Sequence, residues 1–231
     1  MAERVAPGWY GKLPVTGDFL QRRLSDSLVT GWSNWFHQGI TQWHQQKVTA
    51  DAFLRAPVWN FIIPVTPGFQ RIQMGCLLPS RDRVGRSWPL VAVKTFTPEQ
   101  WHPAQLIIAG DWYRQLGSGL LQAVREPQPV DTLEQYLLAL SPLPEPEKQR
   151  SAIMDVIGYQ DLPCTLSWRE VADRFNPQHF ISYWWSNRCD GFPHATHKHS
   201  GILNAQLFSL LFNPAAGAPP GRNGLYPPMF E

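Results

Sequence analysis

The clearest hydrophobic pattern along the chain lies between residues 25 and 43. Apolar side chains recur there on one helical face at a spacing of about 3.6 residues. The positions on this face are Leu28, Trp32, Trp35, Phe36, Gly39 and Trp43. Ser25 or Asp26 precedes them as a candidate N-cap. The pattern therefore predicts an amphipathic helix that lies flat on a sheet.

The predicted sheet consists of runs rich in β-branched and aromatic residues. Three such runs cover residues 58–65, 71–78 and 90–96, and a short strand is predicted at residues 9–13. The connection at residues 66–70 is too short for a crossover. The first two of the three runs are therefore predicted to pair antiparallel.

Helix-start signals mark the next part of the chain. A capping box that begins at Thr97, with proline in the first turn, predicts a helix whose apolar positions continue to residue 124. A second capping box, formed by Asp131 and Glu134, predicts another helix. The proline-rich residues 141–146 cannot be helical, which makes them a candidate boundary.

The last third of the chain carries weaker signals of the same kinds. Residues 147–157 and 167–175 are predicted to be helices, and residues 179–185 alternate as a strand does. Residues 202–212 predict an amphipathic helix. The tail at residues 213–231 is mostly Pro, Gly, Ala and Asn, so it is predicted to lack regular structure.

Length and composition favour one folded domain. The chain has 231 residues, of which 43% are hydrophobic and 16% charged, a balance that buries a sizeable core. We predict a single α/β domain over residues 1–212, with a candidate sub-boundary at residues 141–146 and the Pro/Gly-rich tail at residues 213–231.

Charge, hydropathy and cysteine content exclude several classes of function. The formal net charge is +2 and no basic run is present, which argues against a nucleic-acid partner. The apolar runs are far shorter than the ~20 residues of a membrane helix, and the N-terminus lacks the pattern of a secretory signal. Three widely separated cysteines fit buried thiols in a reducing compartment, so we predict a cytoplasmic protein without membrane insertion.

The eleven tryptophans are an unusual count with two interpretations. Tryptophan is enriched where two protein surfaces meet, which favours a binding role. Large rings also fill a wide core between helices and a sheet. The sequence leaves both interpretations open.

A cluster of potential metal ligands lies near the C-terminus, at Cys189, His194, His197 and His199. Zinc sites use such ligands, but a structural site needs spaced ligand pairs and a catalytic one a carboxylate or a helical His-Glu pair. The spacing fits neither, so we predict a solvent-facing polar loop, no metal and no cofactor. No catalytic site is predicted elsewhere; a metal-dependent enzyme using the three histidines is the alternative.

The segment at residues 79–89 is chemically distinctive, with three arginines, an aspartate and a glycine between two predicted strands. Guanidinium groups and loop N–H groups are suited to holding an anion. In the alternative interpretation, Asp82 accepts hydrogen bonds from Arg83, Arg86 or Arg22 and fixes the loop without a ligand.

Two stretches together resemble the TagF family of bacterial type VI secretion accessory proteins. The first is Gly8-Trp9-Tyr10-Gly11-Lys12-Leu13-Pro14, followed by Gly17-Asp18-Phe19 and Arg22. The second is Ala56-Pro57-Val58-Trp59, with Gly75, Pro79-Ser80, Asp82-Arg83-Val84-Gly85-Arg86 and Pro89-Leu90. The match is dense over residues 8–96 and weaker beyond residue 100, where Trp184-Trp185 and the length support it.

The resemblance implies both a fold and a function. The implied fold is a three-layer α/β/α sandwich, here with a mixed, partly antiparallel sheet. The implied function is post-translational repression of type VI secretion in the cytoplasm, through binding of the forkhead-associated scaffold protein of the system. We expect no phosphatase domain of the kind that is fused to some members, and therefore expect stoichiometric binding. A structural assembly component of the same system is the alternative, and the oligomeric state stays open.

Residue type and position give two sets of candidate residues. The candidates for contact with a partner are Arg83, Arg86, Trp88, Trp184 and Trp185. The candidates for a rigid structural motif are Gly11, Gly17, Asp18, Arg22, Pro57, Trp59, Asp82 and Gly85.

Overall fold

The computed structural model describes residues 6–45, 50–146, 166, 168–187 and 192–212. Its strands form one sheet in the order β2-β1-β5-β4-β3-β6-β7. The strands are β1 (Gly8–Gly11), β2 (Leu20–Arg22), β3 (Trp59–Ile63), β4 (Ile72–Leu78), β5 (Leu90–Phe96), β6 (Ile181–Asn187) and β7 (Pro193–Ser200). The α/β class and the antiparallel pairing of β3 with β4 are confirmed. Every strand pairing in the sheet is antiparallel, so the prediction of a mixed sheet is wrong.

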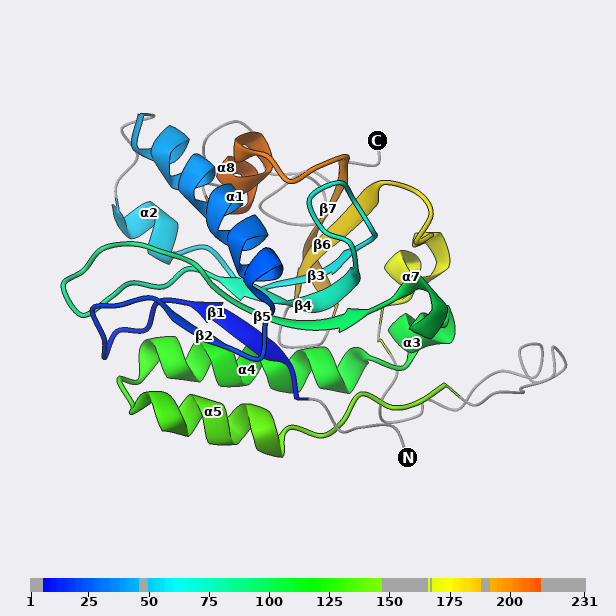
Figure 1. Ribbon diagram of the computed structural model, residues 1–231, viewed down its shortest axis with the longest axis horizontal. Helices are drawn as coiled ribbons and strands as arrows, with labels where there is room; N and C mark the ends of the chain where they lie inside the picture. Colours follow the sequence, from blue (N-terminus) through cyan, green and yellow to red (C-terminus); the bar gives the residue numbers. More distant parts are fainter. Residues whose placement is uncertain (1–5, 46–49, 147–165, 167, 188–191, 213–231) are drawn as a thin grey trace, which may run out of the picture.

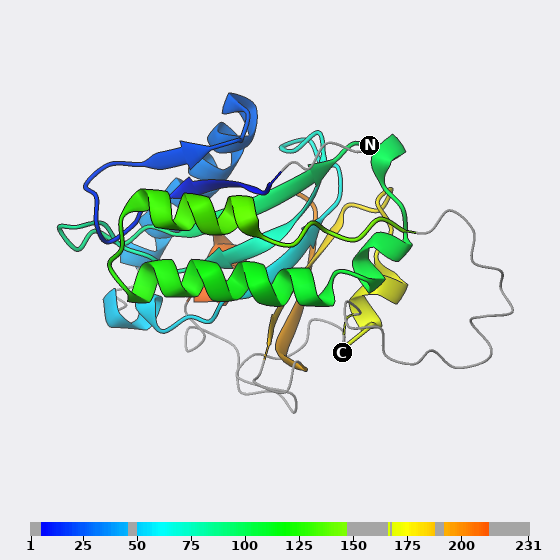
Figure 2. The ribbon, with the colours of Figure 1, turned by 90° about the horizontal axis from the view of Figure 1, so that it is seen from below.

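Helices lie on both faces of this sheet (Figures 1 and 2). The helices are α1 (Asp26–Gln45), α2 (Ala50–Leu54), η1 (Pro98–Gln100), α3 (Ala104–Ile107), α4 (Gly110–Arg125), α5 (Val130–Ala139), α7 (Glu170–Arg174) and α8 (Ala205–Phe212). Figure 1 shows α1, α2 and α8 on one face and α4 and α5 on the other. Each face has its own cluster of buried apolar side chains.

Helix α1 forms as its hydrophobic pattern predicts. All six predicted apolar positions are buried, and the Leu28 N–H donates to Ser25 Oγ at 3.4 Å, in agreement with the N-cap. The helix packs closely on α8, because a methyl group on Gly39 would overlap the ring of Phe208. The indole of Trp32 donates to Gln73 Oε1 of β4 at 2.9 Å, so burial does not leave this N–H without a partner.

The opposite face is covered by α4 and α5. The capping box at Thr97 is confirmed, but it starts the single 3₁₀ turn η1, and the predicted long helix is divided into η1, α3 and α4. The two longer helices approach closely at Gly119, where a Cβ atom would overlap the ring of Tyr136. The Tyr136 hydroxyl donates to the Gln115 carbonyl at 2.8 Å and joins them.

The capping box predicted at Asp131 is wrong, although helix α5 itself forms. The residue at the N-cap is Pro129, and no side chain caps the helix. Glu134 instead accepts a hydrogen bond from Trp9 Nε1 at 2.9 Å and forms an ion pair with Arg23. This carboxylate therefore connects α5 to β1 and to the segment that leads into α1.

The segment at residues 141–146 has no helix or strand, as predicted. Leu143 is buried in the hydrophobic cluster that includes the apolar face of α4, and Gln105 Nε2 donates to the Pro144 carbonyl at 2.7 Å. Buried residues on both sides of the segment, such as Leu116 and Trp185, belong to the same hydrophobic cluster.

The remaining predictions have mixed outcomes. Strand β6 and helix α8 are confirmed with small shifts of their ends. The predicted loop around the three histidines is wrong, because residues Pro193–Ser200 form strand β7. The predicted helix at 147–157, and the tail at 213–231, lie outside the described residues. Among the helices that the structure describes, none is long and apolar enough to span a bilayer.

Candidate functional site

The two loops that carry the distinctive sequence segments lie side by side at one end of the sheet. The β1–β2 loop (residues 12–19) and the β4–β5 loop (residues 79–89) both project at the left of Figure 1. Three backbone carbonyl groups of the first loop accept hydrogen bonds from the second. Arg83 N donates to Thr16 O at 2.8 Å, Arg86 Nη2 to Gly17 O at 3.0 Å and Ser80 Oγ to Lys12 O at 2.7 Å.

Asp82 is the centre of the β4–β5 loop. Its Oδ2 atom accepts from Lys12 Nζ at 2.8 Å and from Arg86 Nε at 2.6 Å. Its Oδ1 atom accepts from the backbone N–H groups of Val84 at 3.1 Å and Arg86 at 2.8 Å. The carboxylate is fully buried, and Lys12 is 5% exposed. Asp82 therefore holds its own loop and anchors it to the end of β1.

The electrostatic environment keeps this carboxylate ionised. Burial by itself raises the pKa of Asp82, since a charge is removed from water. Hydrogen bonds from Lys12 and Arg86, together with the charge of Lys12, outweigh that effect and hold the pKa well below its usual range. The charged pair is thus an internal part of the fold.

These contacts decide between the two interpretations of the loop. Of the three arginines considered as partners of Asp82, only Arg86 contacts it; Arg22 donates to the Gln21 carbonyl, and Arg83 reaches Thr16 through its backbone. The backbone N–H groups of Val84 and Arg86, which could hold an anion, already donate hydrogen bonds to Asp82. The aspartate fills the place that an anion would take.

Two glycines of the predicted structural motif have backbone conformations that other residues rarely adopt. Gly11 has φ 147°, and a Cβ atom there would overlap the Pro89 carbonyl, where β1 passes the end of the β4–β5 loop. Gly85 has φ 87° at the tip of that loop. Gly17 has open space around it, and its carbonyl accepts the Arg86 hydrogen bond.

An aromatic side chain covers the buried pair. The ring of Phe19 lies with its centroid 4.6 Å from Lys12 Nζ and meets Trp88 edge-on at 4.8 Å. Trp88 is buried against Phe36 of α1, which fixes the base under Phe19. Phe19 nevertheless remains 51% exposed.

The outer surface of the two loops combines apolar and positive side chains. Val84 at the loop tip is 68% exposed, and Phe19 lies on the facing loop. The charged side chains of Arg83, Arg86 and Asp18 on the same two loops are also exposed. We name the exposed residues Asp18, Phe19, Arg81, Arg83, Val84 and Arg86 the loop surface.

The three tryptophans predicted to contact a partner are buried, and that prediction is wrong for them. Trp88 is 6% exposed, Trp184 is fully buried on the α1 face, and Trp185 is 2% exposed on the α4 face. Strand alternation explains the pair, because neighbouring residues of β6 point to opposite faces of a sheet that is covered on both sides. Nine of the eleven tryptophans are buried, so the count reflects a wide core.

Pro57 and Trp59 are apart from the loop surface. Pro57 is half-buried ahead of β3, and Trp59 is fully buried on it. The Trp59 indole donates to the Leu211 carbonyl at 2.9 Å and so anchors α8 to the sheet. The role of Trp59 is in the core.

The three histidines do not gather into a site. His197 is fully buried and His199 nearly so, while His194 is half-buried and, by strand alternation, on the other face of β7. Burial lowers the pKa of His197 to about 4. Cys189 lies outside the described residues. Within the part of the chain that the structure describes, no three His, Cys, Asp or Glu side chains are placed to share a metal ion.

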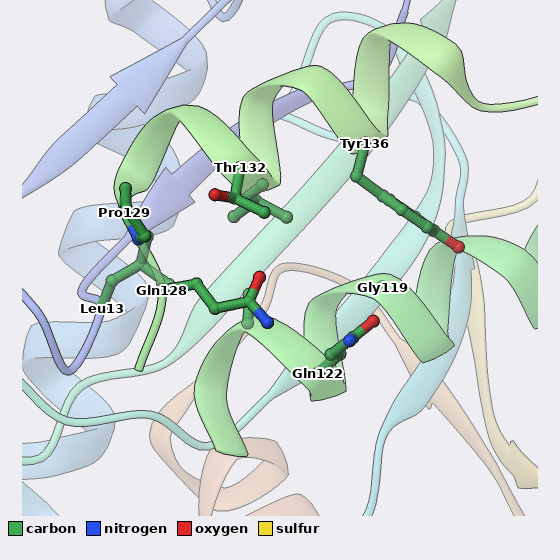
Figure 3. Close-up of a pocket in the computed structure, with 9 residues that line it drawn as sticks. Leu13, Gly119, Gln122, Gln128, Pro129, Thr132 and Tyr136 are labelled. Atoms are coloured by element: carbon green, nitrogen blue, oxygen red, sulfur yellow. The ribbon is translucent and has the colours of Figure 1, made fainter. Parts of the chain in front are cut away.

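A small hollow lies between α4 and α5 (Figure 3). Figure 3 shows Gly119 and Gln122 on α4 facing Thr132 and Tyr136 on α5, with Leu13 at one end. Its volume is about 40 Å³. Pockets that bind cofactors and small substrates have volumes of about 300–1,000 Å³, so this hollow has room for only a few water molecules.

The sequence missed the residues that complete the candidate site. Lys12 gave no signal of its role, because its partner Asp82 is 70 residues away along the chain. Phe19 and Val84 were part of the family resemblance, but not predicted contact residues. A signal was present for Phe19, an apolar residue in a polar turn.

Comparisons with known proteins identify relatives of this chain, and one match covers the region that contains both loops. A family model described as the TagF N-terminal domain, type VI secretion system-associated, matches residues 8–140, which include both loops. The crystal structure of PA0076 from Pseudomonas aeruginosa PAO1 is similar in fold, with a TM-score of 0.66 and 26% sequence identity. The alignment covers 95% of this chain and 99% of that one. No curated protein matches.

Proposed function

The chain belongs to the TagF family of type VI secretion-associated proteins, and we propose that it represses secretion by binding a protein of that system. The proposed partner is the forkhead-associated scaffold protein of the system, and the association of the family with type VI secretion supports a partner from that system. This repression acts after translation. It requires one protein surface to occupy another, without the making or breaking of a covalent bond.

One observation carries this proposal. The loop surface has two exposed apolar side chains, Phe19 and Val84, on a base fixed by the buried pair of Asp82 and Lys12. Binding is strongest where an aromatic or arginine side chain is held in position before the partner arrives, because less conformational entropy is then lost. The loop surface has these properties.

Three buried titratable groups of the described residues are poorly matched to acid–base catalysis near neutral pH. A general acid or base is most effective when its pKa lies near the working pH. Burial raises the pKa of the Cys76 thiol and lowers that of His197 to about 4. The pKa of Asp82 lies well below its usual range, since hydrogen bonds from Lys12 and Arg86 outweigh its burial.

Secretion assays in the producing bacterium test the proposed repression. Deletion of the gene is expected to leave secretion intact or raise it, and overproduction of the chain to lower it. A structural component of the apparatus would give the opposite result, with secretion abolished by deletion. That outcome would replace repression with an assembly role.

Binding measurements with purified proteins test the surface. The double variant Phe19→Ala/Val84→Ser is expected to weaken binding of the scaffold protein by at least ~30-fold, since about 2 kcal/mol is typical of a central apolar contact. The control is Phe180→Ala/Ile202→Ser, which removes two side chains of similar exposure (56% and 58%) outside the loop surface. Equal affinity of the two variants would exclude the loop surface as the binding site.

A further inference from the structure

The positive side chains of the loop surface indicate the chemistry of the partner. Arg81, Arg83 and Arg86 are exposed within six residues of the chain. Asp82, which lies among them, is buried and bonded to Lys12. Residues 12–19 and 79–89 together carry four basic and two acidic side chains, a net charge of +2 that equals the formal net charge of the whole chain. The rest of the chain therefore carries equal numbers of basic and acidic side chains.

Much of this positive charge is available to a partner. Arg86 uses Nε for Asp82 and Nη2 for the Gly17 carbonyl, while its side chain is 64% exposed. Within the part of the chain that the structure describes, the side chains of Arg81 and Arg83 have no hydrogen bond or ion pair. Asp18 is the one exposed acid in the two loops. A partner that brings carboxylates would satisfy guanidinium groups that are otherwise solvated.

The geometry favours carboxylates on a protein segment over a single phosphate group. A phosphate site needs donors that converge on one point, usually including backbone N–H groups. Here the backbone N–H groups of Val84 and Arg86 converge on Asp82 itself. The exposed guanidinium groups are carried by separate positions around Val84 and Phe19, an arrangement that fits several carboxylates around an apolar side chain.

We propose that the partner binds the loop surface through an acidic segment, in which Asp or Glu residues flank an apolar side chain. The apolar side chain contacts Phe19 and Val84, and the carboxylates pair with Arg81, Arg83 and Arg86. This inference rests on the proposed function and specifies the chemistry of the same surface. It makes the affinity dependent on ionic strength, because exposed ion pairs are screened by salt.

Titrations of the purified chain with the scaffold protein test this inference. The charge-reversal variant Arg81→Glu/Arg83→Glu leaves the Asp82 contacts in place. We expect it to weaken binding by at least ~30-fold at about 50 mM salt and by much less at about 300 mM salt. The affinity of Arg81→Gln/Arg83→Gln is expected to lie between that of the charge-reversal variant and that of the wild type. The control is Arg55→Glu/Arg125→Glu, which reverses two exposed arginines elsewhere and should bind as the wild type does.

The outcomes separate the inference from the proposed function. If Phe19→Ala/Val84→Ser loses binding while charge reversal and salt leave the affinity unchanged, the surface is correct and the acidic segment is wrong. If charge reversal strengthens binding, the partner segment is basic and the inference is overturned. If the wild-type chain does not bind the scaffold protein at any salt concentration, the proposed partner is wrong and the inference falls with it.

Discussion

Removal of the Asp82 carboxylate tests whether the buried pair holds the two loops together. In Asp82→Ala, four hydrogen bonds are lost, and Lys12 remains buried without an acidic partner. Breaking a buried ion pair by removing one partner costs about 3–5 kcal/mol, because a charge is left without compensation. Domains of this kind unfold with a free energy of about 5–15 kcal/mol, so the expected loss is a large fraction of the total.

The assay for Asp82→Ala is urea unfolding followed by tryptophan fluorescence. With a slope of about 3 kcal/mol per M urea, the expected loss lowers the midpoint by about 1 M or more. Asp18→Ala is the matched control, because it removes an exposed carboxylate from the facing loop, and its midpoint should stay near that of the wild type. Lys12→Met should cost less than Asp82→Ala, since Asp82 keeps Arg86 and two backbone donors. A loss below about 1 kcal/mol in Asp82→Ala would refute this account of the loops.

Three further predictions concern the core and the backbone. Gly39→Ala should lower the free energy of unfolding by about 1–3 kcal/mol, because its methyl group would overlap Phe208; thermal unfolding measures the loss. The stability should fall as the pH drops from about 6.5 to about 4, by about 3 kcal/mol, because the unfolded chain binds a proton at His197 that the folded chain resists. Urea midpoints across this pH range measure the effect. Gly11→Ala should lower the free energy of unfolding by at least about 2 kcal/mol. Alanine is strained at φ 147°, and its Cβ atom would overlap the Pro89 carbonyl.

Each of these predictions has a control and a contradicting result. The control for Gly39→Ala is Asn34→Ala on the exposed face of α1, which should not lower stability. An equal change in stability in the two variants would contradict the packing argument. His197→Phe should show a weaker pH dependence than the wild type, and identical curves would assign the effect to other groups. Gly17→Ala, where space is open, should be tolerated; the same loss at Gly11 and Gly17 would exclude the close approach as the cause.

Local patterns predicted the elements whose signal lies within a short stretch of the chain. Helix α1 follows its apolar spacing because one face is buried against the sheet and the other is solvated. The β3–β4 pair follows from a connection too short for any other arrangement. The capping box at Thr97 formed because both of its hydrogen bonds are local.

Predictions failed where a long-range contact replaced the local one. Glu134 fits a capping box in the sequence, but the carboxylate is bonded to Trp9 and Arg23, far away along the chain. Trp184 and Trp185 were predicted to contact a partner because the sequence does not show that both faces of the sheet are covered. Each ring is buried in the cluster on one of these faces. The pair of Lys12 and Asp82 has no local pattern at all, because the close approach of two loops creates it.

Hydrogen–deuterium exchange of the chain, alone and bound to the scaffold protein, tests the central claim most directly. The account predicts slower exchange on binding at residues 16–22 and 81–88, with little change in the described part of β6, β7 and α8. Protection confined to β6 and β7, with unchanged exchange in both loops, would contradict it.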